Sequence, residues 1–199
     1  MKADTKAERE FMEQKKNKLL SDMIQNDTDK KMVQLVEAAT DLSCGDICTL
    51  LEVAHSLPFV GNLEGGDTYI NVLTREKESM VIAQYRHPNY DLYKRSIIGE
   101  IERREDEPAV YRALEEGISG RGLIGIIDEG RTVVRHTVSP ILNSEKKVIG
   151  ALTYEYPNAG ADTESIRIIN NQEGKQDPFN RQLGKASDYL QDAILLYDA

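Results

Sequence analysis

The chain has 199 residues, which is enough for one domain of ordinary size with extensions. Its formal net charge of −9 argues against nucleic-acid binding, because acidic groups repel phosphates. No apolar run reaches about 18 residues and no apolar segment follows the charged N-terminus, so we expect a cytoplasmic chain without a membrane contact. The two cysteines, Cys44 and Cys48, argue against a disulfide framework.

The N-terminal region, residues 1–40, is predicted to be a helical extension. Residues 5–25 favour a helix that either lies on the domain surface or dimerises, because the apolar stripe is too broken for a heptad assignment. Asp27 or Thr28 is expected to cap a second helix that runs through Ala39. The stripe consists of Phe11, Met12, Leu19, Leu20, Met23 and Ile24.

A third helix is predicted to begin at Ser43, where Ser43 and Asp46 are similar to a capping box with Asp in place of Glu. We expect it to end near Leu57, before Pro58. Cys44, Cys48 and His55 lie near one face of this helix, so a metal site is conceivable. Nothing nearby completes a set of ligands, and we therefore expect no metal and no cofactor.

The middle of the chain predicts a β-hairpin followed by a connecting region. Asp67–Leu73 and Ser79–Tyr85 read as strands joined by the polar turn 75–78. Residues 89–104 connect this hairpin to the next helix, and within them Tyr93–Ile98 is either a short helix or irregular.

A helix and three strands follow. The helix is expected over Glu107–Glu116, capped by Asp106 and ended by Gly117. Turn signals at 128–130 and 143–145 separate the strands Arg121–Ile127, Arg131–Pro140 and Lys147–Tyr156. The order of elements predicts an α+β domain with a five-stranded antiparallel sheet of PAS or GAF type and helices on one side, plus helical extensions at both ends.

Few residues in the chain carry recognisable chemistry. No phosphate-binding loop or nucleophile motif is present, so nothing identifies an enzyme site. His136 alternates with Val138 and should face the covered side of the sheet, either as a hydrogen-bonded core residue or as a ligand-binding group. His87 ends a strand beside Arg86, where it is either solvated or in contact with a small molecule.

The mixed charge run 103–107 reads either as a solvated start of a helix or as an anion site at Arg103 and Arg104.

The segment from about Cys44 to Tyr156 resembles the N-terminal GAF/PAS-like sensor domain of soluble bacterial sensor histidine kinases. In that group a PAS domain and a kinase core follow, often paired with antitermination response regulators. The resemblance implies a sensory role and transfers no catalytic residue, because no phosphoacceptor or ATP-binding motif matches. The stretches that carry it are Val81–Pro88 (VIAQYRHP), Ser96–Gly99 (SIIG), Arg104–Tyr111 (REDEPAVY) and Val133–Ile141 (VVRHTVSPI).

The resemblance also organises the chain into a sensor domain at 41–157 and a tail at 158–199. The tail reads as a linker, a helix over Phe179–Leu190 and a short apolar run, Ala193–Tyr197. This run resembles the first strand of a following PAS module that the chain cuts short.

The resemblance implies a two-component signal-input domain that binds a small molecule or a partner and relays the signal to a kinase core. The alternative is a structural dimerisation module without a ligand. A homodimer and, through the parent kinase, a response regulator are the expected partners, with no direct nucleic acid. We expect a small polar or anionic ligand between the sheet and residues 86–104, with Arg86 as charge partner and His136 as donor. The candidate binding residues are Asn71, Gln84, Arg86, His87 and His136.

Overall fold

The computed structural model describes residues 15, 18–89, 92–93, 95–127 and 132–157. Residues 18–23 are helical and precede the named elements. The elements that follow are the helices α2 (Asp27–Ala39), α3 (Cys44–Glu64) and α4 (Pro108–Glu116), and the strands β1 (Asp67–Leu73), β2 (Ser79–Tyr85), β3 (Ile101–Glu102), β4 (Gly120–Ile127), β5 (Thr132–Leu142) and β6 (Val148–Pro157).

The strands form one six-stranded antiparallel sheet in the order β3-β2-β1-β6-β5-β4. The prediction of five strands is wrong, because the sheet has a sixth strand, β3, at its edge. In β3, Ile101 pairs with Met80 and Glu102 pairs with Ser79 of β2. The connector before β3 is otherwise irregular where it is described, so Tyr93–Ile98 contains no helix in that part.

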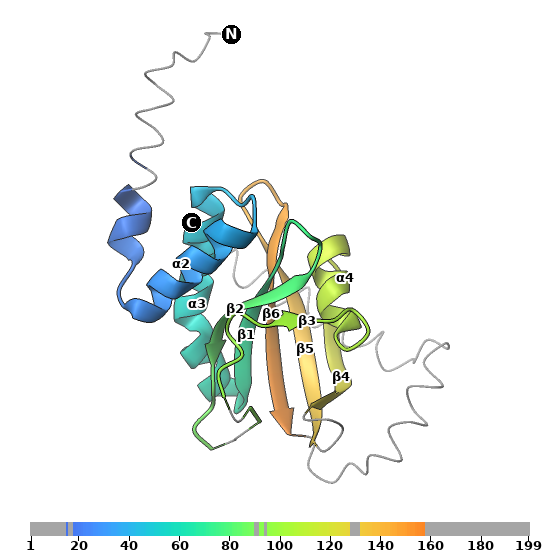
Figure 1. The fold of residues 1–199 in the computed structure, drawn as a ribbon. Helices are drawn as coiled ribbons and strands as arrows, with labels where there is room; N and C mark the ends of the chain where they lie inside the picture. The colour runs from blue at the N-terminus through green and yellow to red at the C-terminus, as the bar shows by residue number, and fades with distance from the viewer. Residues whose placement is uncertain (1–14, 16–17, 90–91, 94, 128–131, 158–199) are drawn as a thin grey trace. The chain divides into compact units, whose positions relative to one another are not determined.

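Helices cover both faces of the sheet, which corrects the prediction of helices on one side (Figure 1). Ile70 pairs with Leu152, and both contact the core formed by α2 and α3. The next pair, Asn71 and Ala151, points the opposite way because successive side chains of a strand alternate. Ala151 packs against α4, so the two faces have different covers.

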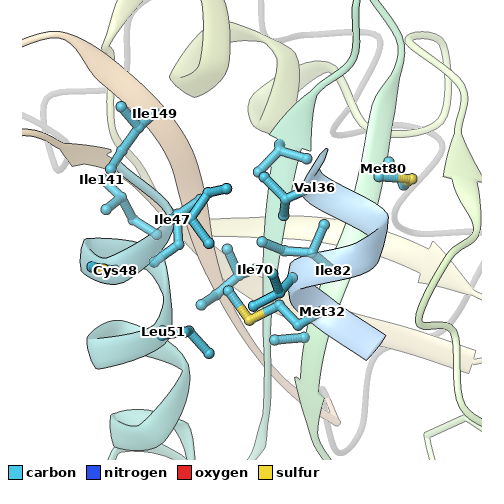
Figure 2. Close-up of a cluster of buried hydrophobic side chains, with 14 of the residues drawn as sticks. Met32, Val36, Ile47, Cys48, Leu51, Ile70, Met80, Ile82, Ile141 and Ile149 are labelled. Atoms are coloured by element: carbon cyan, nitrogen blue, oxygen red, sulfur yellow. The ribbon is translucent and has the colours of Figure 1, made fainter. Parts of the chain in front are cut away.

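The main core lies between the sheet and the pair α2 and α3 (Figure 2). Figure 2 shows Met32 and Val36 of α2 beside Ile70 and Ile82 of the sheet. A register shift in the β1–β2 hairpin lets Ile82 and Ala83 both join this core. Val81 and Gln84 therefore remain on the α4 face, opposite Asn71 and Tyr69.

The N-terminal helices begin and end at slightly different residues from those predicted. Asn26, not Asp27 or Thr28, caps α2 by accepting from the Asp29 backbone N–H at 2.9 Å. The capping box of Ser43 and Asp46 is confirmed, with both reciprocal bonds present. α3 continues through Pro58 to Glu64, so the predicted end before the proline is wrong. Leu20, in the segment before α2, is buried in the main core.

Two adjacent glycines join α3 to β1 for different reasons. Gly65 ends α3 with a φ of 74°, in the left-handed region that L side chains rarely adopt. A Cβ on Gly66 would stand 2.1 Å from the Glu155 carbonyl oxygen, so only glycine lets this backbone approach β6.

Arg75, in the β1–β2 turn, binds the C-terminal end of α2. Its backbone N–H donates to Ala39 O at 2.9 Å, and its guanidinium donates to Ala38 O at 2.7 Å and to Thr40 O. The guanidinium also pairs with Asp41 at 2.6 Å. Because the last carbonyls of a helix lack intrahelical donors, this arginine caps α2 from another element.

The second half of the domain follows the prediction closely. α4 begins one residue later than predicted, and its N-cap is Glu107 rather than Asp106. Gly117 ends it with a φ of 68°, as predicted. The turn between β5 and β6 lies at residues 143–147, where Asn143 N–H donates to Lys147 O.

Several predictions fall outside the described residues: the turn 128–130, the part of the stripe at Phe11 and Met12, and the whole tail 158–199 with Phe179–Leu190 and Ala193–Tyr197. Among the helices that are described, none has both the length and the apolar composition needed to cross a membrane.

Candidate functional site

The α4 face of the sheet carries a row of polar side chains across its central strands. Asp67 on β1 stands opposite Glu155 on β6, and Glu155 stands opposite His136 on β5. Side chains directly opposite one another in antiparallel strands have Cβ atoms about 4.5–5.5 Å apart. The sheet register therefore brings two acidic side chains and an imidazole together on the α4 face, where all three are buried.

Glu155 lies at the centre of this row and is completely buried, with 0% exposure. Its Oε1 accepts from the Tyr69 hydroxyl at 2.9 Å, and its Oε2 accepts from the Tyr93 hydroxyl at 2.6 Å. Tyr69 lies on β1, whereas Tyr93 comes from the connector, and their rings meet edge to face at 6.3 Å between centroids. The two phenols thus fix the carboxylate from two sides.

Glu107 brings a second carboxylate to the row from the start of α4. A residue at this position usually accepts a bond from the helix backbone, but the Glu107 side chain makes no such bond. Its Oε2 lies 3.7 Å from His136 Nδ1, and the side chain is only 15% exposed. The prediction of a solvated helix start is therefore wrong for Glu107.

His136 Nδ1 lies between the two carboxylates, 3.7 Å from Glu107 Oε2 and 3.7 Å from Glu155 Oε1. Both separations exceed hydrogen-bond distance, and Nδ1 has no hydrogen-bond partner among the described residues. His136 is 5% exposed. Gly125 on β4 lies beside the ring, since a Cβ there would be in van der Waals contact with Nδ1 at 3.5 Å.

Glu102 on β3 completes what we name the carboxylate–histidine cluster: Glu102, Glu107, His136 and Glu155. Asn71 Nδ2 donates to Glu102 Oε2 at 2.6 Å, and Ser79 Oγ donates to the same oxygen at 3.3 Å. The Tyr111 hydroxyl of α4 donates to the Glu102 carbonyl at 2.9 Å and accepts from the Ser79 N–H at 2.9 Å. These bonds tie β3 and α4 to the sheet beside the cluster.

Burial and the repulsion of neighbouring carboxylates raise the pKa values of Glu102 and Glu107. Burial, reinforced by the charge of Glu155, raises the pKa of Glu107 to about 9 and that of Glu102 to about 7. Burial also raises the pKa of Tyr69 and of Tyr93 far above the usual range, so both phenols keep the protons that they donate to Glu155. Without a counter-charge, Glu107 therefore holds a proton at neutral pH.

Several buried polar atoms around the cluster have no hydrogen-bond partner in the described part of the chain. Leaving such a group unpaired costs about 1–3 kcal/mol, and natural proteins contain few of them. All of them lie on the α4 face, where their hydrogen-bonding capacity is unused by the described residues. They are Asp67 Oδ2, Asn71 Oδ1, Gln84 Nε2, Glu107 Oε2, His136 Nδ1 and Thr153 Oγ1.

Three of the sequence-predicted site residues, Asn71, Gln84 and His136, lie on this face. Gln84 Oε1 accepts from the Ile97 N–H at 3.1 Å, which ties the connector to β2. Arg86 is exposed, and its charge acts on Asp67. His87 is buried, and its backbone N–H donates to Asp67 Oδ1 at 2.7 Å.

The other motifs of the sequence have structural partners. His55 Nε2 lies 3.1 Å from Asp29 Oδ2, which joins α3 to α2. Within the described residues, three potential metal ligands converge at Glu107, His136 and Glu155, rather than at the cysteines. Arg104 forms a bidentate pair with Glu115, at 2.7 Å for each bond, and stacks over the Tyr111 ring.

Sequence reasoning missed the acidic members of the site. Glu155 had a usable signal, because it alternates with Thr153 and Ala151, and a carboxylate on the covered face of a central strand is expensive to bury. Glu107 had no comparable signal, since it lies in the charge run 103–107 that was expected to remain in solvent, and Glu102 directly precedes that run.

Comparisons with known proteins agree with this architecture. The family model for the GAF domain of histidine kinase PdtaS matches residues 32–173, more than half of the chain. No curated protein matches the sequence.

Among solved structures, the sensor region of a sensor histidine kinase matches with a TM-score of 0.50 and 17% identity, over 66% of this chain and 43% of that one. The chain thus spans less than half of that structure. A transcriptional regulator from Rhodococcus matches with a TM-score of 0.42 and 14% identity, over 64% of this chain and 63% of that one. A light-oxygen-voltage domain matches with a TM-score of 0.41 and 12% identity, over 61% of this chain and 96% of that one.

Proposed function

Because the chain belongs to the family of GAF domains of histidine kinase PdtaS, we propose that it is a signal-input domain whose small cationic ligand binds at the carboxylate–histidine cluster. The kinase core that receives the signal and the response regulator that the kinase phosphorylates are part of this proposal, and both lie outside the chain.

The observation that carries the proposal is the group of buried polar atoms without partners on the α4 face. A ligand that met these atoms would remove a cost of about 1–3 kcal/mol for each. The alternative of a ligand-free dimerisation module predicts a filled and fully paired interior, which fits this face poorly.

The charge of the site supports a cation. The carboxyl groups of Glu107 and Glu155 flank the His136 imidazole. The charge of Glu102 acts on Glu107, and Asp67 stands opposite Glu155. An anion at this place would meet further repulsion in a region of low dielectric constant. The proposal therefore replaces the expected anionic ligand with a positively charged one, although it keeps Asn71, Gln84 and His136 as binding residues, with Arg86 and His87 at the margin near Asp67.

The position of the cluster suggests how binding would be relayed. Its residues come from the sheet, from the start of α4 and, through Tyr93, from the connector. A ligand that binds one arrangement of these elements more tightly than another shifts their populations. The relay to a kinase would run through the terminal segments, and we propose a homodimer as the signalling unit, with the exposed Leu19 available for its interface.

The test is a thermal-shift titration of the full chain against small organic ammonium compounds, divalent metal salts, neutral compounds and carboxylates. A ligand at one hundred times its Kd adds about 2.7 kcal/mol, which raises the Tm of a domain of this size by roughly 5–10 °C. We expect this rise from cations only, and we expect Asn71→Ala and His136→Gln to remove it.

Glu115→Gln, on the exposed face of α4, is the matched control and should keep the full response. The proposed function fails if no compound raises the Tm, or if Asn71→Ala and His136→Gln respond like the wild type.

A further inference from the structure

Three side chains of the cluster offer one ligand atom each to a common centre. The ligand atoms of Glu107, His136 and Glu155 all lie within 4.8 Å of one another, and His136 Nδ1 is 3.7 Å from each of the two carboxylates. Around a tetrahedral Zn²⁺ with bonds of about 2.0–2.1 Å, neighbouring ligand atoms stand roughly 3.3 Å apart. The imidazole would need to approach each carboxylate by a few tenths of an ångström. The two carboxylate oxygens, which lie within 4.8 Å of each other, would need to approach by up to about 1.5 Å for all three atoms to reach bonding positions.

We propose that Glu107, His136 and Glu155 bind a divalent transition-metal ion, for which Zn²⁺ is the representative. This inference rests on the proposed signal-input function and names the chemical class of its ligand. It also departs from the sequence-based expectation that the chain holds no metal site.

A second observation, independent of the acidic residues, points to the same ion. His136 is 5% exposed, and its Nδ1 has no hydrogen-bond partner in the described residues although it points between two carboxylates. An imidazole nitrogen that carries no proton binds metal ions, and Nδ1 takes this role in the tautomer that has its proton on Nε2. A cation at the centre would satisfy Nδ1 and the unpartnered Glu107 Oε2 together.

The surroundings resemble the outer shell of a metal site. Ligating carboxylates are normally held by further hydrogen bonds that set their orientation. Tyr69 and Tyr93 each donate to one oxygen of Glu155, at 2.9 Å and 2.6 Å. Each oxygen keeps a second lone pair, so Oε1 can receive the Tyr69 bond and coordinate the ion.

The donor set selects the kind of metal. Ca²⁺ and Mg²⁺ prefer oxygen ligands alone, whereas one imidazole with two carboxylates suits Zn²⁺, Mn²⁺ or Fe²⁺. Three protein ligands leave a coordination position for water or a small molecule. The bound ion would join the first residue before α4 to β5 and β6, and this would couple metal occupancy to the position of α4 on the sheet.

The experiment is calorimetric titration of the full chain with ZnCl₂ after removal of metals by EDTA. We expect one Zn²⁺ for each chain, and we expect Glu107→Gln and His136→Gln each to weaken the Kd by at least about tenfold. The metal-free variants should melt at or above the temperature of the metal-free wild type, because each replaces a buried group that has an atom without a hydrogen-bond partner in the described residues. Loss of binding in a folded variant separates a ligand role from a structural one.

Cys44→Ser/Cys48→Ser is the matched control and should leave the Zn²⁺ Kd unchanged. Co²⁺ in place of Zn²⁺ should give visible bands without a sulfur charge-transfer band in the near ultraviolet. The inference is overturned if the cysteine variant loses the ion or if His136→Gln keeps it. It is also overturned if organic ammonium compounds raise the Tm but Zn²⁺ does not bind, and in that case the proposed cationic input function still stands.

Discussion

The Tyr93 hydroxyl donates to Glu155 Oε2 at 2.6 Å, and this bond joins the connector between β2 and β3 to a central strand of the sheet. Tyr93→Phe would leave one oxygen of a fully buried carboxylate without its donor. We expect the free energy of unfolding to fall by about 1–3 kcal/mol in urea denaturation. Amide hydrogen exchange should quicken in residues 95–102.

Tyr85→Phe is the control for this change, because the Tyr85 hydroxyl bonds to Asn62 on the exposed surface at 2.9 Å. Tyr85→Phe should lower the free energy of unfolding less than Tyr93→Phe does. Equal losses in the two variants would mean that the buried carboxylate does not depend on the connector.

The two glycines between α3 and β1 should respond differently to the same substitution. Gly66→Ala places a methyl group 2.1 Å from the Glu155 carbonyl oxygen, which is backbone and cannot turn away. We expect the free energy of unfolding of Gly66→Ala to fall by about 3 kcal/mol, at the upper end of overpacking effects. A Cβ at Gly65 would meet no atom within 4 Å, so Gly65→Ala is unfavourable only because of the φ of 74°. We expect this substitution to lower the free energy of unfolding by about 1 kcal/mol. Thermal melting of both variants measures the difference, and a reversed order would contradict the close approach of β6.

Asp46 makes the stability of α3 depend on pH. Partial burial raises its pKa, but hydrogen bonds from Asn143 and Ser43 outweigh burial and leave it below the ordinary value of 3.8. A lowered pKa in the folded state stabilises the protein above pH 3.8, and this contribution is lost as the pH falls through the folded value. Melting curves below about pH 4 should therefore fall less steeply in Asp46→Asn than in the wild type.

Asn143→Ala should act in the same direction, because it removes the Asn143 Nδ2 bond of 2.8 Å to Asp46 Oδ1. Asp29, whose pKa is also lowered overall, keeps part of the acid response in both variants. An unchanged slope in Asp46→Asn would show that the capping box does not carry the pH dependence.

The chain is expected to form a homodimer through its terminal helices. Light scattering at tens of micromolar should give twice the chain mass of 22.4 kDa. Leu19→Glu changes a side chain that is 54% exposed beside the buried Leu20, and it should shift the equilibrium toward monomer. Leu142→Glu, at a residue with 40% exposure on the end of β5, should leave the mass unchanged. A monomeric wild type would contradict the expectation.

The helices and strands could be predicted from the sequence where a local pattern of residues marks their ends. β1 and β2 begin and end at the predicted residues, because two glycines and a polar turn bound two runs rich in strand-forming residues. β3 was not predictable, because two residues carry no periodicity and pair only where the connector meets β2. Pro58 was expected to end α3, but burial of Leu57 and Gly61 on either side of it outweighs the lost bond.

Two of the predicted binding residues could be placed on the α4 face from the sequence, but the acidic character of that face could not be predicted. Asn71 and His136 could be placed on a covered face by alternation alone. The acidic character could not, because Glu107 reaches the site only through the packing of α4, and Glu102 only through β3. These are tertiary contacts that no local pattern in the sequence records.

The capping of α2 by Arg75 has a mechanical consequence. The helix and the β1–β2 turn are held by the arginine backbone bond to Ala39 O and by its guanidinium bonds to Ala38 O and Thr40 O. A displacement of α2 along its axis would therefore move the β1–β2 turn, and through this turn it would act on β1, the strand that carries Asn71. α2 is thereby fixed to one end of the sheet, and spin labels on α2 and on the hairpin turn should keep a constant separation with and without a ligand.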